Sequence, residues 1–350
     1  MPVERNLWFN LKQIALFGLT GTVLGLIYIS IVNGFVNVYP FMNGVVIGVL
    51  MGVLIGSFEI YLFHPRLQQY PFVLMLSFRV VMYTLSIIAI ILIVVTANRA
   101  FRHDQGFFEA LGSEESREYI FHGNFRTAII FTFMAALIAN FVRLISLKIG
   151  RGILTDFILG AYHKPKQMER IFVLLQITNA DYVMKHNEIE TYHHFLNGIY
   201  RAMSIVAMHH HGYVYEYVDD HMLIYWKGSQ RDWAVSLINF HKEALAVMSR
   251  DEAYYKNSYG LIPTFVFSAH GGTVIQAEIG ELKTEIVFHG DVLNTASRIG
   301  SVAKEEGKAF VISDYIFKQT AAIESIATAS IGEFELRGKL QTVSLYSVTA

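Results

Sequence analysis

Long apolar stretches fill the first half of the chain. Four of them are almost wholly apolar over roughly 20 residues or more, at positions 14–35, 44–63, 72–95 and 127–147. At 1.5 Å per residue, a helix of about 20 residues crosses the roughly 30 Å hydrocarbon core of a bilayer. The pattern predicts four transmembrane helices in a membrane domain over residues 1–150. A cleavable signal peptide is an alternative for the first stretch, but the apolar core is too long for one.

Beyond about residue 150, apolar and charged positions interleave as in a water-soluble fold. A juxtamembrane linker is expected over 151–166, where Pro165 stops a helix, and a folded domain over 167–350. The pattern predicts an α+β domain with a ferredoxin-like β-α-β-β-α-β core. Its expected elements are a strand at 171–177, a helix at 188–209, a hairpin at 213–226, a helix at 231–249, strands at 264–277 and 284–288, a helix at 292–305, a strand at 309–313 and a closing antiparallel pair ending at Val348.

Composition narrows the possible functions. Hydrophobic residues make up 53% of the chain and charged residues only 16%, which is too apolar for an ordinary soluble protein. The net charge is −1 and no segment is dense in lysine and arginine, so nothing indicates a nucleic-acid partner. Cysteine is absent, which excludes disulfides, thiolate metal sites and cysteine nucleophiles.

Basic residues predict the orientation in the membrane. They gather around and after the end of the fourth apolar stretch, as Arg143, Lys148, Arg151, Lys164, Lys166 and Arg170. Cytoplasmic flanks of membrane helices carry such an excess of positive charge. The sequence therefore predicts a multi-pass protein of the cell inner (plasma) membrane, with its C-terminal domain in the cytoplasm.

Glycines repeat within two of the apolar stretches. The second carries Gly44, Gly48, Gly52 and Gly56, and the first carries Gly18, Gly21 and Gly25. Small residues on one face let helix backbones approach closely. Two interpretations remain open: packing between these two helices of one chain, or a seam between two chains.

Charged residues are few within the predicted spans. Glu59 and Arg79 lie near predicted helix ends, where their side chains are expected to snorkel toward the interface. This scarcity argues against a transporter or channel.

A glycine turn followed by a helix occupies residues 288–299, Phe-His-Gly-Asp-Val-Leu-Asn-Thr-Ala-Ser-Arg-Ile, and places Asn294 four residues before Arg298. This segment resembles the signature of class III nucleotidyl cyclases. The resemblance extends over residues 162–348, through the entry Tyr-His-Lys-Pro at 162–165, the hairpin Tyr-Glu-Tyr-Val-Asp-Asp at 215–220 and Leu-Arg-Gly-Lys at 336–339. Membrane helices ahead of such a domain also resemble a bacterial branch of membrane-bound cyclases.

This resemblance implies a nucleoside triphosphate substrate and a shared active site. In the family, two domains pair head to tail as a homodimer or heterodimer. Two aspartates of one partner hold two Mg²⁺ or Mn²⁺ ions, and the other partner supplies Asn and Arg. The ribose 3′-hydroxyl attacks the α-phosphate, giving a cyclic nucleotide and pyrophosphate, with the metals stabilising both oxygens.

The metal positions depart from the family pattern. Gln176 stands where the resemblance implies the first aspartate, so metal binding is expected to be weak or lost. Asp220 matches the second aspartate, and Asp219 replaces the usual glycine before it. Asp219 is a possible replacement for the missing charge, although neighbouring strand residues point to opposite faces. Apart from the resemblance, Asp219 and Asp220 are also typical of an exposed hairpin turn.

The residues implied to bind nucleotide are mostly present. Asn294 and Arg298 share one helix face, whereas Val292, Ala296, Ile299 and Ala303 suit the buried face. The resemblance implies that Asn294 orients the ribose and that Arg298 stabilises phosphate charge. Arg337 stands where the family has a triphosphate-binding lysine.

Base preference stays open. Glu216 matches the position that is Lys in adenylate and Glu in guanylate cyclases, but its companion is Val287, where those enzymes carry Asp or Cys. An aliphatic side chain offers no hydrogen bond to a purine. The run of histidines at 209–211 is expected to be a polar helix end.

Two functional hypotheses follow. The first is a cyclase homologue in cyclic-nucleotide signalling, impaired as a homodimer and acting as a regulatory or complementing subunit. The alternative is an active adenylate or guanylate cyclase. The Gln176 substitution favours the first.

Overall fold

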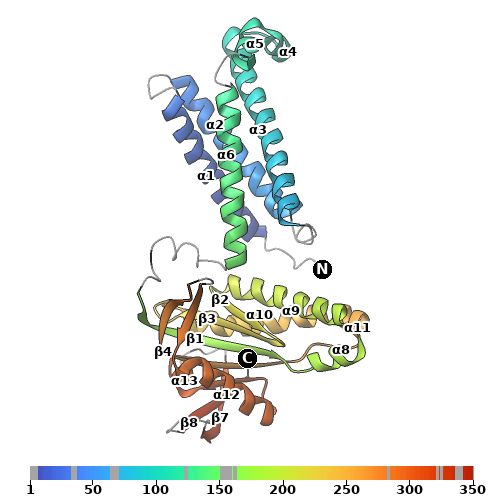
Figure 1. The fold of residues 1–350 in the computed structure, drawn as a ribbon, viewed down its shortest axis with the longest axis vertical. Helices are drawn as coiled ribbons and strands as arrows, with labels where there is room; N and C mark the ends of the chain where they lie inside the picture. The colour runs from blue at the N-terminus through green and yellow to red at the C-terminus, as the bar shows by residue number, and fades with distance from the viewer. Residues whose placement is uncertain are drawn as a thin grey trace. The chain divides into compact units, whose positions relative to one another are not determined.

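A computed structural model describes residues 7–32, 38–63, 71–121, 125–149, 160, 164–281, 284–320, 323, 326–335 and 342–349. The chain divides into two compact units, Met1–Lys148 and Ile149–Ala350. Each unit has a hydrophobic core of its own (Figure 1).

Every regular element described in the first unit is a helix. Its elements are α1 (Leu7–Val32), α2 (Val38–Ser57), a π-helical turn η1 (Phe58–Leu62), α3 (Phe72–His103), α4 (Phe107–Gly112), α5 (Glu114–Phe121) and α6 (Phe125–Ile149). Four segments are long and apolar enough to cross a membrane, as predicted: Asn10–Val32, Phe41–Leu62, Val73–His103 and Phe125–Val142. The short helices α4 and α5, which follow the C-terminal end of α3 in Figure 1, were not predicted.

Helices α1 and α2 pack directly through their glycines. A Cβ atom added at Gly48 would collide with the backbone carbonyl of Gly21, and one added at Gly21 would collide with that of Gly48. The two backbones are therefore as close as the absence of side chains permits. This confirms the interpretation that the glycines pack two helices of one chain, and it leaves no room for a second chain on this face.

Glu59 and Arg79 form a buried ion pair. Arg79 Nη1 lies 2.9 Å from Glu59 Oε1 and 3.2 Å from Oε2, and their side chains are 4% and 2% exposed, respectively. The Tyr83 hydroxyl also donates to Glu59. The expectation that these side chains snorkel was wrong, because a partner of opposite charge inside the bundle compensates the desolvation of each.

The second unit is an α+β domain, as predicted. Its elements are β1 (Lys166–Ile177), α8 (Ala180–His186), α9 (Ile189–His209), β2 (Tyr213–Val218), β3 (His221–Lys227), α10 (Trp233–Arg250), α11 (Glu252–Tyr259), β4 (Phe265–Ile279), β5 (Glu285–His289), α12 (Asp291–Glu305), β6 (Phe310–Ser313), α13 (Asp314–Thr320), β7 (Ala327–Phe334) and β8 (Val343–Thr349).

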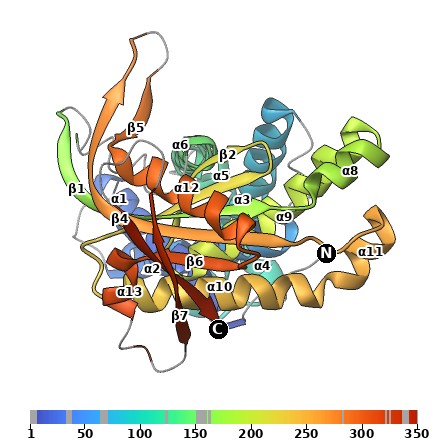
Figure 2. The same cartoon turned by 90° about the horizontal axis from the view of Figure 1, so that it is seen from below.

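The eight strands form one mixed sheet in the order β2-β3-β1-β4-β6-β8-β7, with β5 paired to β4. The segment β2-β3-β1-β4, joined through α9 and α10, has the ferredoxin-like order. Strand β1 begins earlier than the hydrophobic pattern predicts, because its polar first half pairs with β4 from Lys166↔Gln276 onward. In Figure 2, β4 and β5 lie side by side and extend beyond α12.

Alternation along β1 sends side chains to two cores. Ile171, Val173, Leu175 and Ile177 join the core that includes residues of α9 and α10. Phe172 points to the opposite face, in the core that includes α12. Figure 1 shows α9 and α10 on one side of the sheet and α12 on the other. Fully burying one such side chain contributes about 1.5–3 kcal/mol.

One buried histidine lies in the larger core. The His241 ring of α10 packs against Phe267 and Phe310, at centroid distances of 4.8 and 4.6 Å. Neither ring nitrogen has a hydrogen-bond partner among the residues that the structure describes. Burial, followed by the charge of Lys242, lowers the pKa of His241 from 6.5 to about 4.

The glycine contact predicts a stability effect. Gly48→Leu should destabilise the membrane unit by about 1–3 kcal/mol, because the new side chain has no space against α1. The neighbouring Val49 is exposed, so Val49→Leu should have little effect. Thermal unfolding of the purified full-length protein in detergent measures both. Equal stability of the two variants would contradict the packing described here.

The buried histidine predicts a pH effect. The pKa of His241 is lower in the folded state than in the unfolded state, so neutral His241 contributes its full share to the free energy of unfolding above pH 6.5. This contribution is lost as the pH drops toward 4, and the free energy of unfolding falls by up to about 3 kcal/mol. His241→Phe should flatten this dependence, whereas His194→Gln, at an exposed position of α9, should not. Urea unfolding of the full-length protein carrying Trp8→Phe, followed by the fluorescence of Trp226 and Trp233, checks the slope.

Candidate functional site

The end of β1 meets the β2–β3 hairpin turn. Gln176 pairs with His221 in the register of β1 and β3. Its side-chain amide Nε2 donates a hydrogen bond of 3.2 Å to Asp220 Oδ2. The backbone N–H of Ile177 also donates to the Asp220 carbonyl, at 2.9 Å. The structure therefore brings together the two positions that the sequence analysis assigned to metal binding.

His221 occupies the other side of the same carboxylate. Its Nδ1 lies 2.7 Å from Asp220 Oδ1, and the Asp220 side chain is 23% exposed. Both carboxylate oxygens thus have a partner within the chain. The sequence analysis did not single out His221, although its place directly after the aspartate pair was a usable signal.

Asp219 adopts a left-handed conformation, with φ of +50°. Glycine is favoured there, and Asp is among the few other residues that tolerate it. The Asp219 carbonyl accepts a hydrogen bond of 2.5 Å from the Tyr200 hydroxyl, while the residue as a whole is exposed. The turn geometry explains why a glycine or an aspartate fits this position. A metal-binding role for Asp219 stays a prediction.

Nearby carboxylates contribute, after burial, to the raised pKa values of two tyrosines of α9. Burial first, and then Asp220, raises the pKa of Tyr200. The pKa of Tyr192 is raised by burial and then by Asp220, Asp181 and Asp219. Asp181, in the first turn of α8, was missed by the sequence analysis. Negative charge is therefore concentrated at this end of the sheet.

The residues present do not fit a site for two magnesium ions. A hard cation needs carboxylate oxygens, and Gln176 turns an N–H group toward Asp220 rather than adding a charge. In the described part of the chain, no three Asp, Glu, His or Cys side chains are arranged to hold a metal ion. The weakness of metal binding nevertheless stays a prediction.

Helix α12 presents the predicted nucleotide-binding face. It starts after Gly290, whose φ of +148° is accessible to glycine and rarely to other residues. Its buried side carries Val292, Ala296, Ile299 and Ala303, as predicted. Asn294, by contrast, is exposed.

Arg298 is held only loosely within the chain. Its Nη1 lies 3.7 Å from Asp291 Oδ1, which is too long for a hydrogen bond. Among the described residues this buried Nη1 atom has no hydrogen-bond partner. A guanidinium prefers carboxylate or phosphate partners. Its role on nucleotide remains a prediction.

The predicted base-binding residues lie on strands that come close together. Glu216 on β2 is exposed, and half-buried Val287 on β5 pairs with Ala277 on β4. The rings of Tyr215 and Phe288, next to these two residues, have centroids 5.0 Å apart. Tyr215 lies where the β2–β3 register shifts. The two strands therefore approach each other at Tyr215 and Phe288, and no base preference follows from Val287.

Two other segments carry residues that the sequence singled out. Arg337 and the rest of 336–341, like Tyr162 and His163, lie outside the described residues. Helix α9 ends at His209, which confirms the predicted helix end. His209 and His210 each contact Glu243, at 3.4 and 2.7 Å.

Curated relatives point to one family. Adenylate cyclase 2 of Rhizobium meliloti (strain 1021) is 25% identical over 202 residues, covering 58% of this chain and 56% of the relative. An adenylate cyclase of Anabaena cylindrica is 24% identical over 159 residues, covering 45% of this chain and 32% of the relative. The chain therefore spans less than two thirds of either relative. No family model matches it. These similarities support the class III cyclase family.

Solved structures agree on the fold. The structure of a bacterial light-regulated adenylyl cyclase superposes with a TM-score of 0.54 at 13% identity, over 63% of this chain and 63% of that chain. At this identity the likeness shows the fold alone. The α+β unit has the fold of a cyclase domain.

The Gln176 contact generates a prediction about metal binding. Gln176→Asp should tighten Mn²⁺ binding to nucleotide-loaded protein by at least about tenfold, because it places a second carboxylate beside Asp220. Gln167→Asp adds the same charge at an exposed position of β1 and should have no such effect. Calorimetry on the full-length protein compares the two. No gain in affinity for Gln176→Asp would mean that the pocket has changed beyond this one charge.

Proposed function

We propose that this protein is a membrane-anchored class III nucleotidyl cyclase homologue in cyclic-nucleotide signalling, impaired as a homodimer and acting as a complementing subunit. The observation that carries the proposal is the hydrogen bond from Gln176 to Asp220. It supports a neutral amide at the position where the resemblance implies a second carboxylate. A homodimer would repeat this substitution in both shared sites.

The other half of the shared site is intact in sequence. Exposed Asn294 and loosely held Arg298 come from one helix, so a single nucleotide can meet both. Asn294 would hold the ribose, and Arg298 would stabilise the charge that develops on the phosphates. In a heterodimer, these two residues would serve a site whose two aspartates belong to a different chain.

An active cyclase is the second candidate. It is favoured by the retained Asp220 and by the further carboxylates, Asp181 and Asp219, whose charges reach Tyr192. Both relatives described above are adenylate cyclases, which is compatible with this candidate. ATP and GTP are both candidate substrates, because Glu216 and Val287 match neither specificity pattern.

The membrane unit and the basic residues after it support a proposal for where the α+β unit lies. We propose that the α+β unit lies on the cytoplasmic side of the inner membrane, where nucleoside triphosphates are available. The described basic residues Lys164, Lys166 and Arg170 support this orientation.

An activity assay separates the two candidates. Purified full-length protein should convert little ATP or GTP with either Mg²⁺ or Mn²⁺. Mixed with a second cyclase chain that keeps both aspartates but lacks its own Asn and Arg, it should yield activity that neither chain has alone. Arg298→Gln should lower this activity by roughly 100-fold, the loss expected for one transition-state contact.

The control is Arg250→Gln, at an exposed arginine at the end of α10, which should leave the mixed activity unchanged. Robust turnover by the purified chain alone would favour the active-cyclase alternative. Failure of every mixture, with both chains folded and paired, would contradict complementation.

A further inference from the structure

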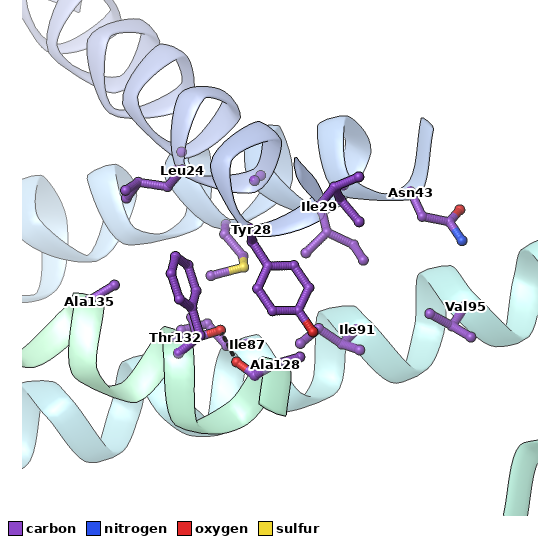
Figure 3. Close-up of a pocket in the computed structure, with 18 of the residues that line it drawn as sticks. Leu24, Tyr28, Ile29, Asn43, Ile87, Ile91, Val95, Ala128, Thr132 and Ala135 are labelled. Carbon is purple, nitrogen blue, oxygen red and sulfur yellow. Dashed lines mark hydrogen bonds between the residues drawn. The ribbon is translucent and has the colours of Figure 1, made fainter. Parts of the chain in front are cut away.

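The membrane unit contains a cavity of about 380 Å³. It lies among α1, α2, α3 and α6, with one residue of α5 at its edge (Figure 3). This volume falls within the range of about 300–1,000 Å³ typical of small-molecule sites. The cavity has no part in the proposed cyclase chemistry, since every residue that lines it belongs to the membrane unit.

The inner part of the cavity is apolar. It is lined there by Phe17, Met51, Ile55, Ile87 and Ala135, which come from four different helices. In Figure 3 the Tyr28 ring of α1 projects into the space, with Ile91 and Ala128 close to it. The apolar wall suits a hydrocarbon chain.

The other end of the cavity is polar. It is formed where α2 begins and α3 ends, and its lining residues there include Asn43, Asn98, Arg99, Arg102 and Tyr119. Asn98 Nδ2 donates a hydrogen bond of 2.7 Å to Asn43 Oδ1. The polar groups therefore lie at one end and the apolar residues deeper in the bundle.

Arg99 is fixed at this end by contacts with α5. Its Nη1 donates to Ser116 Oγ at 2.9 Å, and its guanidinium lies 5.2 Å from the centre of the Tyr119 ring. Buried Ser116 in turn donates to the Ala110 carbonyl at 2.6 Å. These contacts use one edge of the planar fork and hold it in a defined position, as a pre-organised anion site requires.

The charged side chains in the described cavity lining are both basic. The described lining residues include two arginines and no aspartate or glutamate. A guanidinium prefers carboxylate or phosphate partners, which it can bind through two parallel hydrogen bonds. In a partly apolar surrounding this attraction is stronger than in water.

We propose that the cavity binds an amphiphile with an anionic head group and an apolar tail, the head at Arg99 and Arg102 and the tail among Met51, Ile87 and Ala135. Carboxylate and phosphate heads share the required chemistry. The proposal does not rest on the cyclase function, because binding can be measured without activity.

Photolabelling of the full-length protein in lipid nanodiscs tests the proposal. The probe is a photoreactive diazirine analogue of dodecanoic acid. Dodecanoate or dodecyl phosphate should compete with it, and their relative strength identifies the preferred head group. Uncharged dodecanol should compete at least about tenfold less well, because it lacks the charge-assisted hydrogen bonds. Labelled peptides should map to α1, α2, α3 or α6 at residues lining the cavity.

Three variants sharpen the test. The double variant Arg99→Gln and Arg102→Gln should lower labelling by at least about tenfold. Ala135→Phe should abolish it by filling the apolar part. Arg126→Gln, at an exposed arginine of α6 outside the cavity lining, should label like the unaltered protein. Equal competition by dodecanol, labelling outside the cavity, or unchanged labelling of both Ala135→Phe and the double arginine variant would overturn the proposal.

Discussion

Strand β1 is the element on which the α+β unit depends. It pairs antiparallel with β4 along its whole length and with β3 from Arg170 to Gln176, so the sheet holds this second part of the strand on both edges. Its alternating side chains supply two separate cores, one on each face. Because the strand is fixed on both edges, the position of Gln176 at its end is fixed as well. The candidate site takes its geometry from that constraint.

The charges of the side chains around Asp220 decide whether this site suits a divalent cation. A divalent cation would need carboxylates facing each other, whereas the chain places an amide N–H and an imidazole beside Asp220. These partners satisfy the carboxylate without an added ion. On helix α12, Arg298 has a single carboxylate near it among the described residues, at 3.7 Å. The carboxylate of Asp220 is thus satisfied within the chain, whereas Arg298 Nη1 has no hydrogen-bond partner among the described residues.

Buried charges are also compensated by partners within the membrane unit. Glu59 and Arg79 compensate each other inside the bundle, and no free backbone edge is needed because the spans are helical. Arg99 has partners of a weaker kind, a serine hydroxyl and an aromatic ring. Close packing of α1 on α2 through Gly21 and Gly48 brings their backbones together, while α3 and α6 leave a cavity beside them. The unit thus combines a tight helix pair with space for a ligand.

The sequence by itself determined the elements. Helix and strand periods are local properties, so the four spans and most strands and helices of residues 166–313 could be read from hydrophobic spacing, with boundaries within about two residues for most of them. The short helices α8 and α11 were not predicted, because each spans only about two turns. The buried face of α12 and the shared face of Asn294 and Arg298 followed from the helical repeat alone. The start of β1 did not, because its polar residues are held by pairing with β4 rather than by burial.

Only the tertiary structure decided which distant residues meet. The contacts of Asp220 with Gln176, of Glu59 with Arg79, and of Arg99 with Ser116 each join separate elements, and their side-chain types do not identify the partner. For the same reason the sequence left open whether the glycines join two helices or two chains. Long-range pairing depends on the chain's path through space, and a one-dimensional pattern carries the period of each element but not the distance between elements.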